Sequence, residues 1–214
     1  MATVTGMDVD AFTQTRRSLH GVAELLLAGP QHAVSGKITL RALPGGFGTT
    51  HTPDVRVEGA TLVVADRRAP IDGRTAGALA AELGLQPGDL AAVYRDGSGL
   101  GMDDVLRVDE AAAARIAEAY SIGDRALRAL VPEATPILWP EHFDIGISVD
   151  SERVNFGVSP GDSALEVPYM YVGPWEPPPA DGFWNQSFGA ARELPADVDA
   201  VVSFFEEGRS RLRR

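Results

Sequence analysis

The spacing of hydrophobic positions changes along the chain from helical to extended and back again. Four stretches carry apolar residues three and four positions apart, which is typical of helices that bury one face. Between them, apolar and polar residues alternate in short runs separated by turn residues, which predicts two antiparallel β-meanders. The predicted helices are 10–28, 75–83, 109–130 and 196–211, and the predicted strand regions are 37–65, 139–149, 153–159 and 169–175.

Glycine and proline mark where these elements end. Gly29-Pro30 predicts a stop for the first helix, because proline cannot continue a regular helix. The glycine-rich segment 45–53 interrupts the first meander and is expected to be a hairpin loop, the alternative being a flexible lip over a site. Pro177, Pro178 and Pro179 predict a stiff surface connector.

The order helix, meander, helix, helix, meander, helix predicts an α+β protein. A chain of 214 residues fits one compact domain spanning 1–214, built from two helix-plus-antiparallel-meander halves at 8–100 and 104–214. The repeated order suggests a degenerate internal duplication, although no residue-level repeat accompanies it.

Composition removes several classes of function. A formal net charge of -11 disfavours nucleic acid and anionic membrane surfaces as partners, and the basic run from Arg209 to Arg214 is expected to place cations at a helix end. The absence of cysteine excludes disulfides, thiolate nucleophiles and thiolate zinc sites. With no signal-like or membrane-spanning stretch, a cytoplasmic location is expected. No motif identifies a cofactor or a metal site.

Aromatic residues concentrate in the second half. Nine of the fifteen fall between Trp139 and Phe188, and such a concentration builds either a core or the wall of a pocket. The residues that we expect to line a ligand cleft are Tyr169, Tyr171, Trp175 and Trp184.

The second meander has one polar face. Alternation places His142, Asp144 and Gly146 on one side of a strand and apolar residues on the other. A two-residue turn would pair Gly146 with Asn155 and Asp144 with Gly157, and a four-residue loop would give the same two faces. The glycines would leave a depression that a ligand could enter. The alternative is a solvated sheet face whose glycines serve bulges.

His142 and Asp144 are the candidate catalytic residues. An aspartate two positions away on the same face could orient the imidazole or share a cation with it. Glu141 should point to the opposite face, so a metal would need another ligand, for which His51 is a candidate. His20 and His32 are interpreted as structural histidines.

Two serine-containing stretches resemble parts of hydrolase motifs, but their surroundings in the sequence do not fit those motifs. Gly161-Asp162-Ser163-Ala164-Leu165 spells the opening of the GDSL hydrolase signature, but it follows a Pro-Gly turn in mid-chain, which favours chance. Gly97-Ser98-Gly99 lacks the spacing of a nucleophile elbow and is expected to be a loop.

The carboxy-terminal half resembles an uncharacterised bacterial family. The motifs that carry the resemblance are Trp139-Pro140-Glu141-His142-Phe143-Asp144, then Asn155-Phe156-Gly157-Val158-Ser159-Pro160-Gly161-Asp162, and Pro168-Tyr169-Met170-Tyr171. The amino-terminal half is similar only in organisation. The resemblance implies a shared domain and supplies no catalytic role, cofactor or substrate.

Three hypotheses of function follow from the sequence. The first is a small-molecule-binding domain whose aromatic residues line a cleft beside His142, Asp144 and Asn155. The second is a metal-assisted or histidine-dependent hydrolase that uses His142 and Asp144. The third is a protein-interaction module with an exposed aromatic patch. Whether the chain is an enzyme stays open among them.

Overall fold

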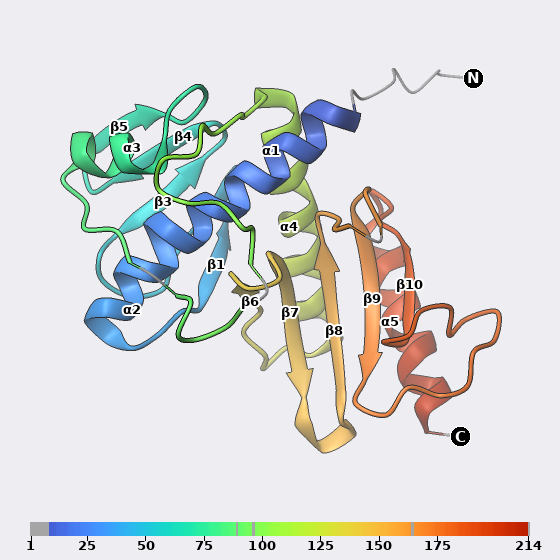
Figure 1. The fold of residues 1–214 in the computed structure, drawn as a ribbon. Coiled ribbons are helices and arrows are strands. Elements are labelled where there is room, and N and C mark those ends of the chain that lie inside the picture. Colours follow the sequence, from blue (N-terminus) through green and yellow to red (C-terminus); the bar gives the residue numbers. More distant parts are fainter. Residues whose placement is uncertain (1–8, 89, 96, 164, 214) are drawn as a thin grey trace.

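The protein is an α+β structure built on one antiparallel sheet of ten strands, seen here in a computed structural model (Figure 1). The structure describes residues 9–88, 90–95, 97–163 and 165–213. The strands are β1 (Leu40–Leu43), β2 (Gly46–Thr49), β3 (Val55–Glu58), β4 (Thr61–Val64), β5 (Arg67–Pro70), β6 (Ile137–Trp139), β7 (Asp144–Val149), β8 (Val154–Ser159), β9 (Tyr169–Pro174) and β10 (Ala190–Glu193). The helices are α1 (Val9–Val22), the π-helical η1 (Ala23–Ala28), α2 (Gly29–Ser35), α3 (Ala76–Leu83), α4 (Glu110–Leu130), the short 3₁₀ turn η2 (Asp150–Glu152) and α5 (Val198–Leu212).

The sheet joins two meanders of five strands each. Its order is β10-β9-β8-β7-β6-β1-β2-β3-β4-β5, so the first strand of one meander pairs with the first strand of the other, at Leu40 and Leu138. Each meander follows a long helical segment and precedes a shorter helix. This arrangement matches the predicted order of elements. The duplication itself stays a prediction.

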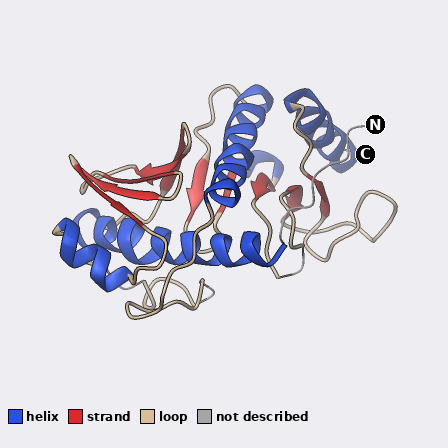
Figure 2. Ribbon diagram, turned by 90° about the horizontal axis from the view of Figure 1, so that it is seen from above, coloured by secondary structure: helices blue, strands red, loops and turns tan. Residues whose placement is uncertain are grey.

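Helices lie on both sides of the sheet. In Figure 1, α1 crosses in front of the first meander, while α4 and α5 lie behind the second, and Figure 2 shows this layering from above. The apolar face of the second meander packs on α4 and α5, because Ile145 and Val158 reach Gly123 of α4 and Phe156 meets Phe205 of α5 at 5.6 Å between ring centroids. The front face of β7, β8 and β9 therefore carries the polar residues, as the alternation predicts.

The first helix does not stop at Gly29-Pro30. It continues through η1 and α2 to Ser35, where Gly36 in a left-handed conformation (φ 70°) ends it. The wide π turn carries the chain past the proline: the Gly29 amide donates to the carbonyl of Glu24, five residues back. A wider turn avoids the close contact that a proline ring makes with the preceding turn of an α-helix.

Residues 46–49 of the glycine-rich segment form a central strand, β2, and only the residues that flank it belong to turns. β2 pairs with β1 on one side and β3 on the other. Gly46 is needed because a side chain there would meet the carbonyl of Val57 at 1.8 Å. The buried amide of Gln31 ties the segment to the first helix, accepting from the Thr50 and His51 amides at 2.7 Å each.

The second meander differs from its prediction in register. Residues 139–149 form two strands instead of one, because the chain turns back between β6 and β7, and His142 lies in that turn. The β7–β8 connection spans four residues, so Gly146 pairs with Gly157 and Ser148 with Asn155. The observed register therefore differs from the predicted one by two residues, and each side chain still points to the predicted face of the sheet.

The basic carboxy-terminal run holds the last helix in place. Arg209 donates to Glu152 at 2.7 Å and Arg211 to Glu207 at 2.8 Å, while Arg214 lies outside the described residues.

Over the described part of the chain, no helix has both the length and the apolar character needed to cross a membrane.

Candidate functional site

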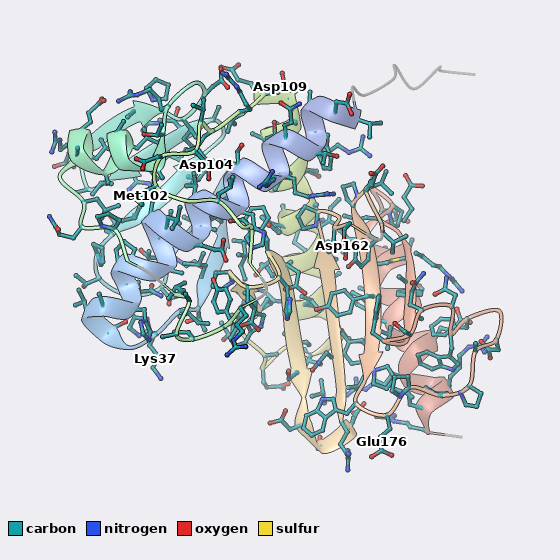
Figure 3. All side chains as sticks on the ribbon, viewed as in Figure 1. Lys37, Met102, Asp104, Asp109, Asp162 and Glu176 are labelled. Atoms are coloured by element: carbon teal, nitrogen blue, oxygen red, sulfur yellow. The ribbon has the colours of Figure 1, made fainter. Side chains whose placement is uncertain are left out.

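A cleft of about 1230 Å³ lies on the front face of β7, β8 and β9. Its floor is the polar face of these strands, one wall is α1, and the rims are loop segments around Ser98 and Asp162. Figure 3 labels Asp162 of the cleft lining above β8 and β9, and Glu176, the neighbour of the lining residue Trp175, below them. The first half of the chain supplies the α1 wall and the second half supplies the floor.

The side chain of Tyr171 occupies the depression beside Gly146 and Gly157 that was predicted to admit a ligand. Gly157 pairs with Tyr171 across β8 and β9, and a Cβ on Gly157 would meet the Tyr171 ring at 2.4 Å. A Cβ on Gly146 would come within 3.1 Å of the Tyr171 hydroxyl. The glycines therefore admit an aromatic ring across the strands, and its hydroxyl reaches Asp144.

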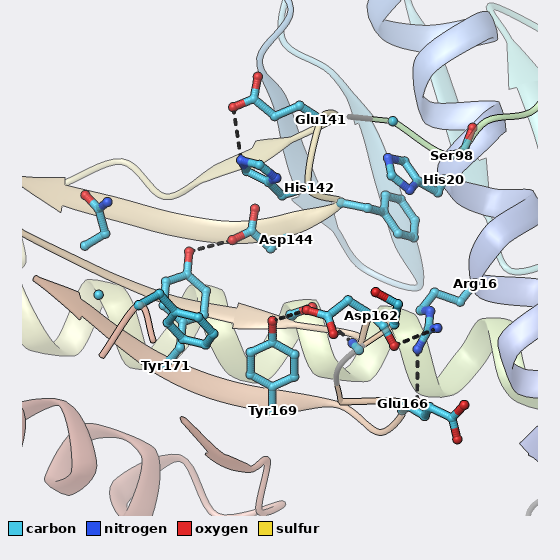
Figure 4. A pocket seen from close by; sticks show the side chains of 18 of the residues that line it. Arg16, His20, Ser98, Glu141, His142, Asp144, Asp162, Glu166, Tyr169 and Tyr171 are labelled. Carbon is cyan, nitrogen blue, oxygen red and sulfur yellow. Dashed lines mark hydrogen bonds and ion pairs between the residues drawn. The ribbon is translucent and has the colours of Figure 1, made fainter. Parts of the chain in front are cut away.

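Asp144 is a buried carboxyl with one oxygen in use (Figure 4). The Tyr171 hydroxyl donates to Oδ2 at 2.5 Å, whereas Oδ1 finds no hydrogen-bond partner among the described residues. Only 6% of the residue is exposed. Burial raises the pKa of Asp144, against the opposing effect of the Tyr171 hydrogen bond, and burial beside this carboxyl raises the pKa of Tyr171 far above its ordinary value.

Gly157→Ala is expected to displace Tyr171 and to lower the free energy of unfolding by about 1 kcal/mol, the loss of one hydrogen bond. The effect is modest because the obstructing atoms are the far end of a side chain that can rotate. Gly173→Ala is the matched control, since its nearest atom would be 3.7 Å away on the same sheet face. Urea denaturation measures both, and equal stabilities for the two variants would contradict the assigned packing.

His142 lies apart from the arrangement expected of a base oriented by Asp144. It sits in the β6–β7 turn with 66% of its side chain exposed, and its Nε2 lies 3.5 Å from Oε1 of Glu141. Glu141 and His142 thus approach each other, contrary to the prediction that they point to opposite faces. A turn does not follow the alternation of a strand, which explains the difference.

His20 lines the cleft and is a residue that the sequence interpretation assigned to structure alone. Its Nε2 lies 2.7 Å from the carbonyl of Pro140, which fixes the proton on that nitrogen, and its ring stacks on Phe143 at 5.2 Å. Burial lowers the pKa of His20, with the Glu24 carboxylate 3.8 Å away opposing the shift. At neutral pH the imidazole is therefore uncharged, with Nδ1 as an acceptor.

Polar contacts hold the upper rim of the cleft. Arg16 donates to the carbonyls of Glu166 at 3.0 Å and Asp162 at 3.2 Å, which ties this loop to α1. The Tyr169 hydroxyl donates to Oδ2 of Asp162 at 2.7 Å. On the neighbouring rim, Arg17 donates to the Ser98 carbonyl at 3.3 Å. The GDSL-like stretch thus forms part of a rim, although its Ala164 lies outside the described residues.

Two exposed aromatic residues stand at the lower end of the cleft. Trp175 is 51% exposed and Phe188 38%, and both belong to the cleft lining. Asn155 belongs to the floor on β8, and its amide oxygen accepts from Ser148 at 2.7 Å. Trp184 is buried against Phe183 and lies apart from this lining.

The structure thus brings together six of the seven predicted site residues. These are His142, Asp144, Asn155, Tyr169, Tyr171 and Trp175. His51 is on the exposed turn after β2, away from the cleft lining, and the described residues contain no group of three histidines or carboxylates placed to hold a metal ion.

One signal in the sequence could have found the α1 wall. Thr13, Arg16, Arg17, His20 and Glu24 recur at intervals of three and four, opposite the buried stripe of the same helix. Four of them line the cleft, and Glu24 lies behind it, accepting from the Ser98 amide at 2.9 Å. A polar stripe of this kind indicates the face of the helix that points away from the core. The two arginines and the histidine within it indicate a candidate site on that face.

Comparison with family models, with curated proteins and with solved structures finds no match to this chain. The resemblance of the carboxy-terminal motifs to an uncharacterised bacterial family therefore stays a prediction.

Proposed function

We propose that this protein binds a small organic molecule in the cleft between α1 and the front face of β7, β8 and β9. The observation that carries the proposal is the buried carboxyl of Asp144, which keeps one oxygen without a partner in the described structure while lining a cleft. A buried polar atom without a partner is costly, and a ligand group that bonds to it would remove the cost.

The shape and lining of the cleft support the same proposal. Ligand sites are concave, with mostly apolar and aromatic walls and a few polar anchors. Here Tyr169, Trp175 and Phe188 supply aromatic surface, and Asp144 and His20 supply an acceptor or donor on the floor and the wall. The site lies between the two halves of the chain, a common place for ligands.

The two other hypotheses have less support in this geometry. The Asp144 carboxyl bonds to Tyr171 and its other oxygen has no partner among the described residues, so no hydrogen bond joins it to His142 as the hydrolase hypothesis requires. An interaction module would need a broad exposed aromatic patch, whereas Tyr169 and Trp184 are buried.

A ligand screen tests the proposal. Mixtures of common metabolites are added to the protein, binding is detected by saturation-transfer NMR, and dissociation constants are measured by tryptophan fluorescence. Trp175→Ala is expected to weaken the binding of a true cleft ligand about tenfold, because truncating a tryptophan that contacts the ligand commonly costs more than 1 kcal/mol.

Val34→Ala is the control for this screen. Val34 is 68% exposed and lies on α2, outside the cleft lining, so its variant should bind every hit as the wild type does. A screen without hits, or hits that Trp175→Ala and Val34→Ala bind equally well, would count against a ligand cleft at this place.

A further inference from the structure

Asp144 lacks the positive partner that a buried carboxylate needs. No arginine, and not the single lysine, forms an ion pair with it within the described ranges. The titratable groups around it are Tyr171 on β9, Tyr169 on the same strand, Tyr120 on α4, and Glu141 and His142 in the β6–β7 turn. Of these groups only His142 can carry a positive charge, and it is largely exposed and lies beside Glu141. Buried charges are normally paired, so among the described residues this carboxyl has no buried cation as its partner.

Aromatic rings line the cleft beside this carboxyl. Tyr171 lies 6.3 Å from Tyr169 and 6.3 Å from Phe188, the latter nearly perpendicular at 85°. Further along the cleft, Trp175 already carries a cation, since the Arg153 guanidinium lies 5.4 Å from its ring centre. The faces of such rings attract ammonium groups, most strongly where water is excluded.

The arginines of the cleft do not turn it into an anion site. Arg16 donates to two backbone carbonyls and Arg17 to one, and both belong to the α1 wall rather than the floor. The third arginine of the lining, Arg95, is exposed and lies outside the floor strands. Glu141, Asp162 and Glu166 also line the cleft and offset their charge. The net charge of -11 over the whole chain favours the approach of cations.

We propose that the cleft takes an organic cation, an amine attached to a small aromatic or apolar group, with Asp144 as its counter-ion and the tyrosine and phenylalanine rings as its walls. This inference rests on the proposed function and names the class of ligand. The ammonium group would donate to Oδ1 of Asp144, while Tyr171 keeps its bond to Oδ2.

His142 lies beside this oxygen. Figure 4 shows the second oxygen of Asp144 on the side of His142, and Oδ1 is screened from solvent. The His142 side chain is 66% exposed, so it can rotate without disturbing the core. Entry of the ammonium group would require this rotation.

Three probes of one size and different charge test the proposal. Benzylamine is a cation, benzyl alcohol is neutral and benzoate is an anion, and each is titrated into ¹⁵N-labelled protein while the Trp175 indole and the amides of β7 to β9 are followed by NMR. Benzylamine is expected to bind about tenfold more tightly than benzyl alcohol, the worth of one hydrogen bond to a charged group, and benzoate more weakly still.

Two variants with the same change of charge separate Asp144 from general electrostatics. Asp144→Asn is expected to remove the preference for benzylamine over benzyl alcohol. Asp124→Asn removes a carboxylate from α4 that pairs with Arg128 far from the cleft lining, and it should keep the preference. Thermal unfolding confirms that both variants are folded.

The pH dependence gives an independent readout. An alkyl amine stays protonated from acid to neutral pH, so its affinity should rise with pH until Asp144 is ionised and then level off. A ligand that accepts a hydrogen bond from the protonated Asp144 carboxyl would show the opposite slope. Asp144→Asn should abolish the rise.

Each contrary outcome has a definite meaning. Tightest binding of benzoate, equal binding of all three probes, or an unchanged preference in Asp144→Asn would overturn the cation proposal and leave a ligand cleft standing if the metabolite screen gives hits. Absence of any shift with benzylamine would overturn it as well. Failure of the screen itself, with no loss in Trp175→Ala, would remove the proposed function beneath it.

Discussion

Replacement of Phe143 by alanine is expected to lower the free energy of unfolding by about 3–5 kcal/mol. The ring is 2% exposed and contacts Phe47 and Tyr120 edge-on at 5.5 and 5.6 Å, with His20 stacked on it. Its removal leaves a cavity where the α1 wall, α4 and the first meander meet. The measurement is urea denaturation of the variant and the wild type.

The same variant should also change His20. Water entering the cavity would relieve the burial that lowers the pKa of His20, so this pKa should rise toward its ordinary value of 6.5, which an NMR titration of the imidazole would detect. Phe188→Ala is the matched control, since that ring is 38% exposed, and it should cost less than about 1 kcal/mol. A similar loss in both variants would contradict the central place given to Phe143.

Asp144→Asn is expected to stabilise the protein at neutral pH by about 1–3 kcal/mol, because it removes a buried carboxylate with an unsatisfied oxygen and keeps an acceptor for Tyr171. The gain should depend on pH. The folded protein holds the Asp144 proton more tightly than the unfolded chain, so wild-type stability falls as pH rises from about the ordinary pKa of 3.8 to the raised pKa of Asp144. Below that window the variant and the wild type should be alike.

Asp162→Asn provides the contrast. Asp162 accepts from the Tyr169 hydroxyl and from the Leu165 amide, so its carboxylate is well bonded, and the variant should be neutral or less stable at every pH. Denaturation curves from pH 3 to 8 compare the variants. A stabilising Asp162→Asn, or an Asp144→Asn variant that is less stable at neutral pH, would contradict this assignment. A residue that makes the folded protein less stable than it could be is typical of a binding site.

The face of the second meander could be predicted because strand alternation is a local property. Ile145 and Phe156 face the helices, and Asp144 and Asn155 face the cleft, whether the connecting turn has two residues or four. The register depends on the length of the β7–β8 connection, and the sequence did not decide between two residues and four. The position of His142 depends on the turn between β6 and β7, which strand alternation cannot predict.

Other parts of the structure depend on contacts between distant segments. Gly46 and its neighbours resemble a loop by composition, and they become a strand because β1 and β3 lie close on both sides. Likewise, a glycine at 157 indicates missing volume, but only the pairing with Tyr171 shows what occupies it. The sequence could not place His20 in the cleft lining, because its partners, Phe143 and Pro140, are more than a hundred positions away.

The π-helical turn at Ala23–Ala28 sets the phase of the long amino-terminal helix. It contains one residue more than the equivalent α-helical turn, and each residue of an α-helix advances the side chains by about 100°. Ahead of the turn, Arg16 and His20 face the cleft, and behind it Gln31 faces the first meander. A one-residue deletion in this turn would straighten the helix and rotate these two surfaces out of step, so the cleft wall and the sheet anchor could not both be satisfied.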